Sequence, residues 1–504
     1  MSTANTPARL PLHTKILFGL GSMSDGAQLQ LVGGVLLLYY NQILKLPAQW
    51  VSLALGISLF VDAFWDPLLG HVSDNLRTRL GRRHGLMYFA AVPAGMAFTA
   101  LWLPPAGLTT FQLFLWLLGC VMAFRLFHSC YMVPSGALTP EVAPDYHDRT
   151  TLIGYRWMLG AIGGAITAVL TYGVFLRKTP QYALGQLNPA GYSPMAITIG
   201  LFIAATILIS SLGTHSRIPT LHRPPARRPS LIESLREIGA TLNNRNFVIA
   251  LMAGMLGATS TALYQGLTIY FSTYMFHLPS SNIMVLILTL VVSAPLAFMV
   301  APATSRRWGK RNACMGLFFA SLLFTHGPIV LRLLGLFPQN GSPLLLPILM
   351  VNNTLGGILG MGGFILSTSM IADIVEENQI KTGRRSEGLL FSADALLNKI
   401  VSGMATILPG LLLAAVHFPE GAKPDGLDPS VMRNLAMIYV PLAAGFSIIS
   451  IATWRLYRIT ERDHTDHLEV VRALDAAGLT SDEADIRMEA GLAELKLSGL
   501  PATR

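Results

Sequence analysis

Charged residues are scarce in this sequence. Asp, Glu, Lys and Arg make up only 12% of its 504 residues, whereas an ordinary soluble domain carries about a quarter. Hydrophobic residues account for 52%, and so few charges cannot cover the surface that such a chain would expose to water. The composition therefore excludes a soluble globular protein and indicates one that is surrounded by lipid.

Cysteine is also rare, and the first residues show no removable signal peptide. Cys120, Cys130 and Cys314 all fall in apolar segments, where this residue type is usually a small buried hydrophobe. We therefore expect neither a disulfide nor a metal site there. The opening residues MSTANTPARL contain no short apolar stretch with a cleavage site, so the first membrane helix is expected to act as the insertion signal.

The apolar residues form blocks that are long enough to cross a bilayer. A hydrocarbon core about 30 Å thick needs about 20 residues of helix. Twelve such blocks can be counted, so the sequence predicts an all-α integral membrane protein with twelve transmembrane helices. Their approximate cores are residues 17–43, 50–69, 86–103, 111–138, 152–174, 194–212, 248–276, 283–302, 314–336, 344–371, 389–416 and 435–454.

Lys and Arg are distributed unevenly between alternate loops. With the N-terminus placed inside the cell, 27 of the 36 fall in inner segments, 5 in outer loops and 4 within helices. Because Lys and Arg collect on the cytoplasmic side of membrane proteins, both termini are predicted to be cytoplasmic. This asymmetry explains the net charge of +9, and no nucleic-acid partner is expected.

A basic motif occurs twice, as RLGRR at 79–83 and RWGKR at 307–311, at a spacing of 228 residues. Inner loops tend to be basic, but two six-helix repeats related by an axis along the membrane normal also place such copies at equivalent positions. The predicted organisation is a cytoplasmic N-terminus (1–16), a six-helix bundle (17–212), a cytoplasmic central loop (213–247), a second six-helix bundle (248–454) and a cytoplasmic tail with helical segments (455–504).

Two carboxylates lie inside the second predicted helix, where charge is costly. Asp62 and Asp66 are four residues apart, so they lie one turn from each other on the same face. Neither tolerates lipid contact. When both are ionised they repel, which raises the proton affinity of one or lets a monovalent cation bridge them. This pattern predicts a coupling-ion site; the alternative is that helix ends or nearby basic residues satisfy them.

Four more ionisable residues within predicted helices are candidates for the solute site: Asp25, Arg125, Arg156 and Lys399. Lys399 lies in the middle of a second-half helix. We expect it to neutralise Asp62 and Asp66 across the bundle, in a contact that binding of the ion or the solute rearranges.

Charged residues of two inner loops form a separate group. They are interpreted as an inner gate, in which salt links that form in one conformation bias the movement of one half against the other. The alternative is that these charges only set the topology. The gate candidates are Asp74, Arg79, Arg82, Arg83, Glu376, Arg384 and Arg385.

The segment DAFWDPLLG at 62–70, followed by Asp74 and RLGRR, resembles the signature of the glycoside-pentoside-hexuronide:cation symporter family, to which melibiose permease belongs. Further matches are VPSGALTPE at 133–141, DYHDR at 145–149, Arg156, and KTGRRSEG at 381–388 through to Lys399. The resemblance spans most of residues 15–455. It implies a major facilitator fold with two pseudo-symmetric six-helix bundles.

The resemblance also implies roles for single residues. The positions of Asp62 and Asp66 belong to the cation site, with a hydroxyl retained as Ser129. The position of Arg156 contributes to the sugar site, and that of Lys399 lies close to both.

Departures from melibiose permease concern the ion and the solute. A third acid is replaced by Met132 and a site amide by Trp65. Because hard cations such as sodium prefer several oxygen ligands, these losses favour a proton over sodium at Asp62 and Asp66. An aromatic sugar platform is replaced by Gly136, and a helix-one acid by Gly26. Related members include a sodium-dependent lysophosphatidylcholine symporter, so an amphipathic lipid is an alternative solute.

The sequence therefore predicts a cation-coupled secondary symporter that works by alternating access in the plasma (inner) membrane, as a monomer without an organic cofactor. Its solute is expected to be a sugar or glycoside. A symporter or flippase of lysophospholipid or another amphipathic lipid is the alternative. A membrane-embedded prenyltransferase-like enzyme is a remote one, because Asp-x-x-x-Asp resembles magnesium-diphosphate motifs but no good second motif faces it. A transporter-like sensor that uses the tail is another.

Overall fold

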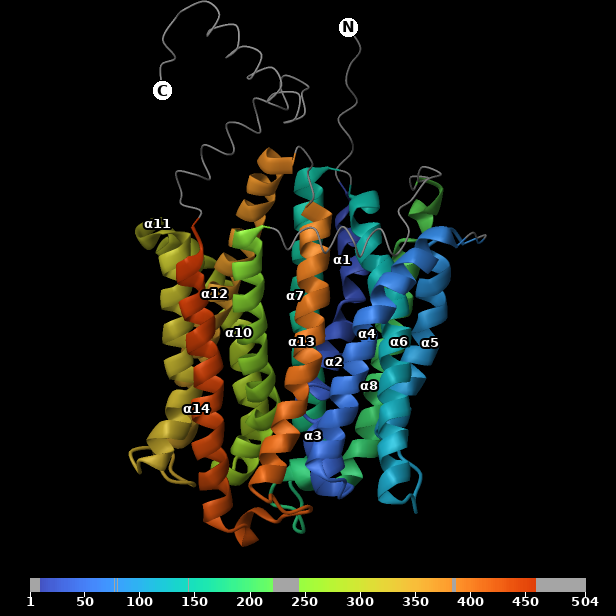
Figure 1. Cartoon of the computed structure of the whole chain (residues 1–504). Coiled ribbons are helices and arrows are strands. Elements are labelled where there is room, and N and C mark those ends of the chain that lie inside the picture. Colours follow the sequence, from blue (N-terminus) through green and yellow to red (C-terminus); the bar gives the residue numbers. More distant parts are fainter. Residues whose placement is uncertain are drawn as a thin grey trace, which may run out of the picture.

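The chain folds into a bundle of long helices that run roughly side by side (Figure 1). The computed structural model describes residues 10–76, 78, 80–143, 145–220, 244–382 and 387–458. The described ends of the chain, at α1 and after α14, lie at the same end of the bundle (Figure 1). We call this end the terminal end and the opposite one the far end.

Residues before the central loop form one group of helices, drawn in blue to green in Figure 1. Their first stretch is broken into short pieces, and the later helices are long. The elements are α1 (Leu12–Leu20), α2 (Met23–Leu31), α3 (Leu36–Leu38), the π-helical turn η1 (Tyr39–Ile43), α4 (Ala48–Asn75), α5 (His84–Leu101), α6 (Thr110–Val142), α7 (Tyr146–Ala168), the π-helical η2 (Val169–Phe175), the short 3-10 turns η3 (Gly185–Leu187) and η4 (Pro189–Gly191), α8 (Tyr192–Gly213) and η5 (His215–Thr220).

The residues after the central loop form the second group, drawn in light green to red (Figure 1). Its elements are α10 (Arg245–Tyr270), the π-helical η6 (Phe271–Met275), α11 (Ser280–Leu333), α12 (Leu345–Thr382), α13 (Glu387–Ala415), the 3-10 turn η7 (Pro424–Gly426), α14 (Pro429–Thr453) and η8 (Trp454–Leu456).

The described helices confirm an all-α multi-pass membrane protein. Ten of them are long and apolar enough to cross a bilayer, fewer than the twelve predicted crossings. Two features account for the difference. The first apolar stretch is divided among α1, α2, α3 and η1, none of them long enough alone. The 54-residue α11 is interrupted at Gly309, whose φ of 74° and ψ of 155° are not helical.

The repeated basic motif has the same local structure in both groups of helices. Gly81 and Gly309 have φ values of 78° and 74°, in the left-handed region where glycine alone is unstrained. Arg82, the residue after Gly81, binds Glu141 of α6. Lys310, the residue after Gly309, binds Asp373 of α12 at 2.7 Å. The two copies are thus equivalent in structure as well as in sequence.

Helices α4 and α13 bring the two groups into contact. A Cβ atom at Gly56 would lie 2.8 Å from the Gly403 carbonyl oxygen, and one at Gly403 would lie 3.1 Å from that of Gly56. Only glycine permits so close an approach of two helix backbones. Asp62 of α4 and Lys399 of α13 lie within two turns of this crossing, which brings their side chains together.

Candidate functional site

Asp62 is the most enclosed charged group of the site. Only 4% of the residue is exposed. Its Oδ2 atom is 2.7 Å from Lys399 Nζ and 3.5 Å from Arg125 Nη1, and its Oδ1 atom accepts a hydrogen bond of 3.1 Å from Ser129 Oγ. Both oxygens of Asp62 therefore have partners, as a buried carboxylate requires.

Asp66 is held on one side only. Its Oδ2 atom lies 2.5 Å from Lys399 Nζ. Its Oδ1 atom is buried and has no hydrogen-bond partner among the described residues. An unpaired buried oxygen is costly, so this atom is ready to accept a proton or a cation.

Lys399 joins the two groups of helices at this point. It comes from α13 and binds both aspartates of α4, which is the contact expected from charge balance in the sequence. Arg125 of α6 binds Ser58 Oγ through its Nε atom at 3.0 Å in addition to Asp62. The structure thus assembles Asp62, Asp66, Arg125, Ser129 and Lys399 into one cluster, which we call the charge cluster.

Arg156 and Asp25 are not part of the charge cluster. Arg156 of α7 donates from Nε to Ser22 Oγ (3.4 Å) and from Nη1 to Thr139 Oγ1 (3.1 Å). Its guanidinium carbon lies 5.2 Å from the centre of the Phe18 ring. Asp25 on α2 is exposed and forms no ion pair with the described residues. Of the four predicted solute residues, Arg125 and Lys399 therefore lie in the charge cluster, and Arg156 and Asp25 lie outside it.

Ser24 and His128 form a polar contact that sequence reasoning did not pair. Ser24 Oγ donates to the Gly21 carbonyl oxygen at 2.7 Å, and it lies 3.1 Å from His128 Nε2. A serine hydroxyl has one hydrogen, so when it points to Gly21, His128 Nε2 is the donor to Ser24. His128 follows Arg125 by one turn of α6, so this contact links the α1–α2 break to the helix that carries the charge cluster.

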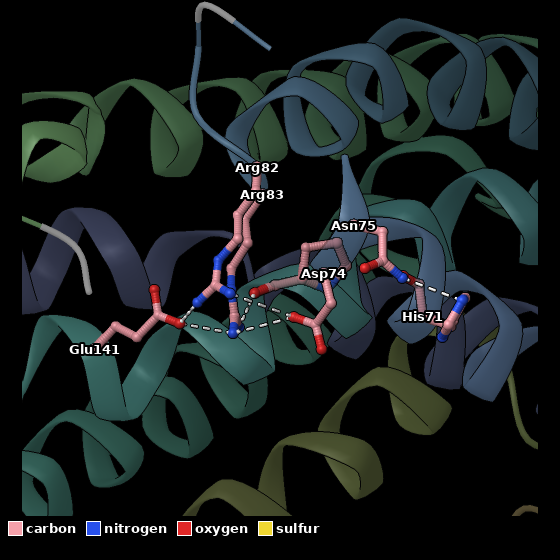
Figure 2. Close-up of polar contacts among 7 residues, drawn as sticks. His71, Asp74, Asn75, Arg82, Arg83 and Glu141 are labelled. Atoms are coloured by element: carbon pink, nitrogen blue, oxygen red, sulfur yellow. Dashed lines mark hydrogen bonds and ion pairs between the residues drawn. The ribbon is translucent and has the colours of Figure 1, made fainter. Parts of the chain in front are cut away.

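Three of the first-half gate candidates, Asp74, Arg82 and Arg83, come together around Glu141 (Figure 2), and the loop between α4 and α5 lies at the terminal end (Figure 1). Arg82 and Arg83 both bind Glu141 Oε1, Arg83 at 2.7 Å, and both also approach Asp74 Oδ1, at 4.0 and 3.5 Å. Glu141 was not among the predicted gate residues, although it ends the VPSGALTPE segment. Arg79 lies outside the described residues.

The structure does not describe the side chains of the second-half gate candidates. Arg384 and Arg385 lie outside the described residues, and so does the side chain of Glu376 in α12. The described ion pair of this region joins Lys310 Nζ to both oxygens of Asp373, at 2.7 and 2.9 Å.

The far end contains a hydrogen-bond network that sequence reasoning missed. Gln42 of η1 is 5% exposed, and both ends of its amide are engaged. Its Oε1 atom accepts from Tyr274 Oη and from the Ala422 backbone N–H, each at 2.9 Å. Its Nε2 atom donates to Asn41 Oδ1 (2.5 Å) and to the Pro419 carbonyl oxygen (3.3 Å). Gln42 thus ties the first group of helices to the second.

The backbone around this network is repeated in the two groups. Lys45 and His277, 232 positions apart in the sequence, have φ values of 58° and 48°, and each precedes Leu-Pro. Leu46 N–H donates to the Tyr40 carbonyl at 2.9 Å, and Leu278 N–H to that of Ser272 at 2.8 Å. The same offset of 232 relates Gln42 to Tyr274, so the two hydrogen-bonded residues occupy corresponding positions in the two groups. The shared Leu-Pro was the only signal in the sequence.

The charge cluster does not have the composition of a metal centre. No group of three or more His, Cys, Asp or Glu side chains that would hold a metal ion occurs within the part of the chain that the structure describes. A transported monovalent ion needs no such group.

The fold and the cross-bundle charge cluster define a multi-pass membrane transporter. The chain matches the xylose transporter XylE of Escherichia coli with a TM-score of 0.58 at 11% identity, covering 91% of this chain and 98% of that one. A family described as MFS/sugar transport protein matches residues 17–461. The chain therefore belongs to this branch of the major facilitator superfamily, that of the glycoside-pentoside-hexuronide:cation symporters, as its motifs predicted.

Named relatives cover nearly the whole chain. The isoprimeverose transporter of Lactiplantibacillus pentosus is 24% identical, over 88% of each chain. An Escherichia coli protein is 25% identical over 94% of this chain and 98% of its own; it is named as a 2,3-dihydroxypropane-1-sulfonate exporter, an assignment that the name marks as provisional. The sodium-dependent lysophosphatidylcholine symporter 1 of Gallus gallus is 22% identical over 95% and 92%. Membership of this family is consistent with the plasma (inner) membrane.

Proposed function

We propose that the protein is a cation-coupled symporter whose ion site is the charge cluster. Two observations support this proposal. Lys399, from the second group of helices, is shared by Asp62 and Asp66 of the first group. Asp66 Oδ1 is buried and has no hydrogen-bond partner among the described residues. An ion that binds Asp66 neutralises one of the two carboxylates that hold Lys399 in place. Ion binding thereby changes a contact between the moving halves.

The surroundings of Asp66 favour a proton over sodium. Sodium needs several oxygen ligands, and Arg125 and Lys399 already place two positive charges beside the aspartates. A proton needs only the one free oxygen. Protonated Asp66 no longer attracts Lys399, which then keeps Asp62 as its carboxylate partner.

We propose that transport proceeds by alternating access between two six-helix bundles. On this proposal α1 to η1 count as one crossing and α11 as two, divided at Gly309, which gives twelve. The predicted bundles 17–212 and 248–454 then rock about the charge cluster, with both chain termini in the cytoplasm. Contacts across the far end, above all that of Gln42 with Tyr274, support a state closed on that side.

We propose a sugar-like organic solute, because a sugar transporter is among the relatives and the matching family is one of sugar transport. The lysolipid alternative is supported by the lysophosphatidylcholine relative and by the open space beside Gly136, where an added Cβ would meet nothing within 4 Å. The family and its neighbours are transporters, which points away from the prenyltransferase-like enzyme. We further propose that the protein acts as a monomer without an organic cofactor.

Uptake by reconstituted proteoliposomes tests the proposal. A panel of glycosides and lysolipids is offered under an imposed proton or sodium gradient. Wild type should accumulate one class under the proton gradient, and Asp66→Asn should abolish accumulation while leaving counterflow, because it mimics the protonated acid. Asp425→Asn is the matched control, since that side chain is 95% exposed at the far end. Sodium-driven uptake, or full coupling in Asp66→Asn, would contradict the proton site.

A further inference from the structure

Arg156 is a cation in the helical bundle whose direct hydrogen-bond and ring partners are all neutral. Its recorded partners are the hydroxyls of Ser22 and Thr139 and the ring of Phe18. No carboxylate of the described residues forms an ion pair with it, and Asp25, an acid on the neighbouring α2, does not reach it. Its positive charge therefore has no directly bound carboxylate among the described residues.

Two of the other cations that the sequence places within helices differ in this respect. Arg125 has Asp62, and Lys399 has Asp62 and Asp66. An arginine in the membrane interior is costly unless it is paired or faces a water-filled cavity. Hydroxyls accept from two of the five N–H donors of Arg156 and carry no negative charge, so an anion from outside the protein would stabilise Arg156 in a way that these side chains cannot.

Open space lies one turn of α6 away from a hydroxyl partner of Arg156. Thr139, which binds its guanidinium, lies one turn from Gly136 on α6, and a Cβ at Gly136 would meet no atom within 4 Å. Thr139 is also ten residues beyond Ser129, the hydroxyl partner of Asp62, which is about 15 Å along the helix axis. An anion at Arg156 would thus be separated by several turns of α6 from the hydroxyl that binds Asp62.

We propose that Arg156 receives an anionic oxygen-bearing group of the solute, a carboxylate, sulfonate or phosphate. The inference rests on the proposed function, because it names the chemical class of the solute that the transporter carries. A guanidinium binds such a group with two parallel N–H···O bonds. Ser22 and Thr139 hold the plane of Arg156 and so act as positioning residues. The same chemistry is offered by a soluble organic anion and by the headgroup of a lysolipid.

The net charge carried across the membrane in each transport cycle distinguishes an anionic solute from a neutral one. One proton with a monoanion moves no net charge, whereas one proton with a neutral sugar moves one positive charge. Proton-driven uptake of the anion should therefore produce no current on a solid-supported membrane, while uptake of a neutral solute should produce one.

Binding to purified protein in detergent tests Arg156 without transport. Isothermal titration compares matched pairs: glucose with glucuronate, glycerol with 2,3-dihydroxypropane-1-sulfonate, and a monoacylglycerol with lysophosphatidic acid. The anion of at least one pair should bind more tightly than its neutral partner. Arg156→Gln should weaken that binding by about 10- to 100-fold, as for a lost charge-assisted hydrogen bond. Arg156→Lys should lose less, and Thr139→Val less again. Thermal unfolding of each variant checks that it is folded.

The outcomes distinguish this inference from the proposed function. Anion-selective binding that Arg156→Gln leaves unchanged, or no preference for the anion in any pair, overturns the inference. A preference in the lipid pair alone assigns the lysolipid headgroup, and one in the soluble pairs assigns a free organic anion. If Asp66→Asn and wild type both bind the anion but neither gradient drives wild-type uptake, the coupling proposal fails and the role of Arg156 stands.

Discussion

The two ends of the bundle are held by different kinds of contact. At the terminal end, Arg82, Arg83 and Glu141 form ion pairs within the first group of helices, and Lys310 with Asp373 does so within the second. At the far end, neutral hydrogen bonds join one group to the other. Charged pairs thus stabilise each half at the terminal end, whereas neutral contacts join the two halves at the far end. On the proposed cycle the far-end contacts have to break, and neutral hydrogen bonds make that less costly than buried ion pairs would.

The largest effect is expected from Glu141→Gln at the terminal end. Glu141 is shared by two arginines and its side chain is 12% exposed, so neutralising it leaves Arg82 and Arg83 close together with Asp74 as the remaining carboxylate. Breaking such a buried pair costs about 3–5 kcal/mol. We expect a large fall in the thermal unfolding temperature in detergent. Glu141→Asp, which keeps the charge, is the control, and an unchanged unfolding temperature would contradict the assignment.

A smaller effect, of a different kind, is expected from Gln42→Leu at the far end. This change leaves the Ala422 N–H and the Pro419 carbonyl without their partner, at a cost of about 1–3 kcal/mol for each unsatisfied group. The cost falls on the closed far end, so the equilibrium should shift towards opening there. In a variant without native cysteines, Thr273→Cys, buried in wild type, should react faster with a membrane-impermeant thiol reagent.

Tyr274→Phe should produce a weaker shift in the same direction. It removes one hydroxyl, while Gln42 Oε1 keeps its bond from Ala422. A single neutral hydrogen bond contributes about 1 kcal/mol, so labelling at Thr273→Cys should rise by about fivefold. If Tyr274→Phe matched or exceeded Gln42→Leu, Gln42 would not be the centre of the network.

The smallest effect is expected from Asp373→Asn. Asp373 is itself buried, with a side chain 7% exposed, but Asn has nearly the same shape and leaves no charge there. Its partner Lys310 is 34% exposed and can turn to water, unlike the less exposed Arg82 and Arg83, so the loss should be about 1 kcal/mol or less. High salt should lower the stability of wild type by a similar small amount through this pair. An effect as large as that of Glu141→Gln would show that the two copies of the basic motif contribute equally to stability.

The charge cluster was predicted from the sequence more completely than its surroundings. Asp62 and Asp66 share a face because they are four residues apart, and Lys399 was expected between them because few cations lie inside the helices. The partners of Arg156 were not predicted, because Ser22, Phe18 and Thr139 meet it through the rotation of α1 and α6 about their axes. Gln42 was missed because a neutral amide near a helix end carries no charge signal.

The sequence by itself determined a helical membrane protein, the paired acids on one helix face and the repeated basic motif, because spacing along a single chain decides which residues share a face. Only the tertiary structure decided which faces meet. It joins Lys399 to both aspartates, gives Glu141 to two arginines, leaves Arg156 among hydroxyls and closes the far end through Gln42. These outcomes depend on how closely two helices approach and how each is turned, and backbone contacts such as that of Gly56 with Gly403 set both.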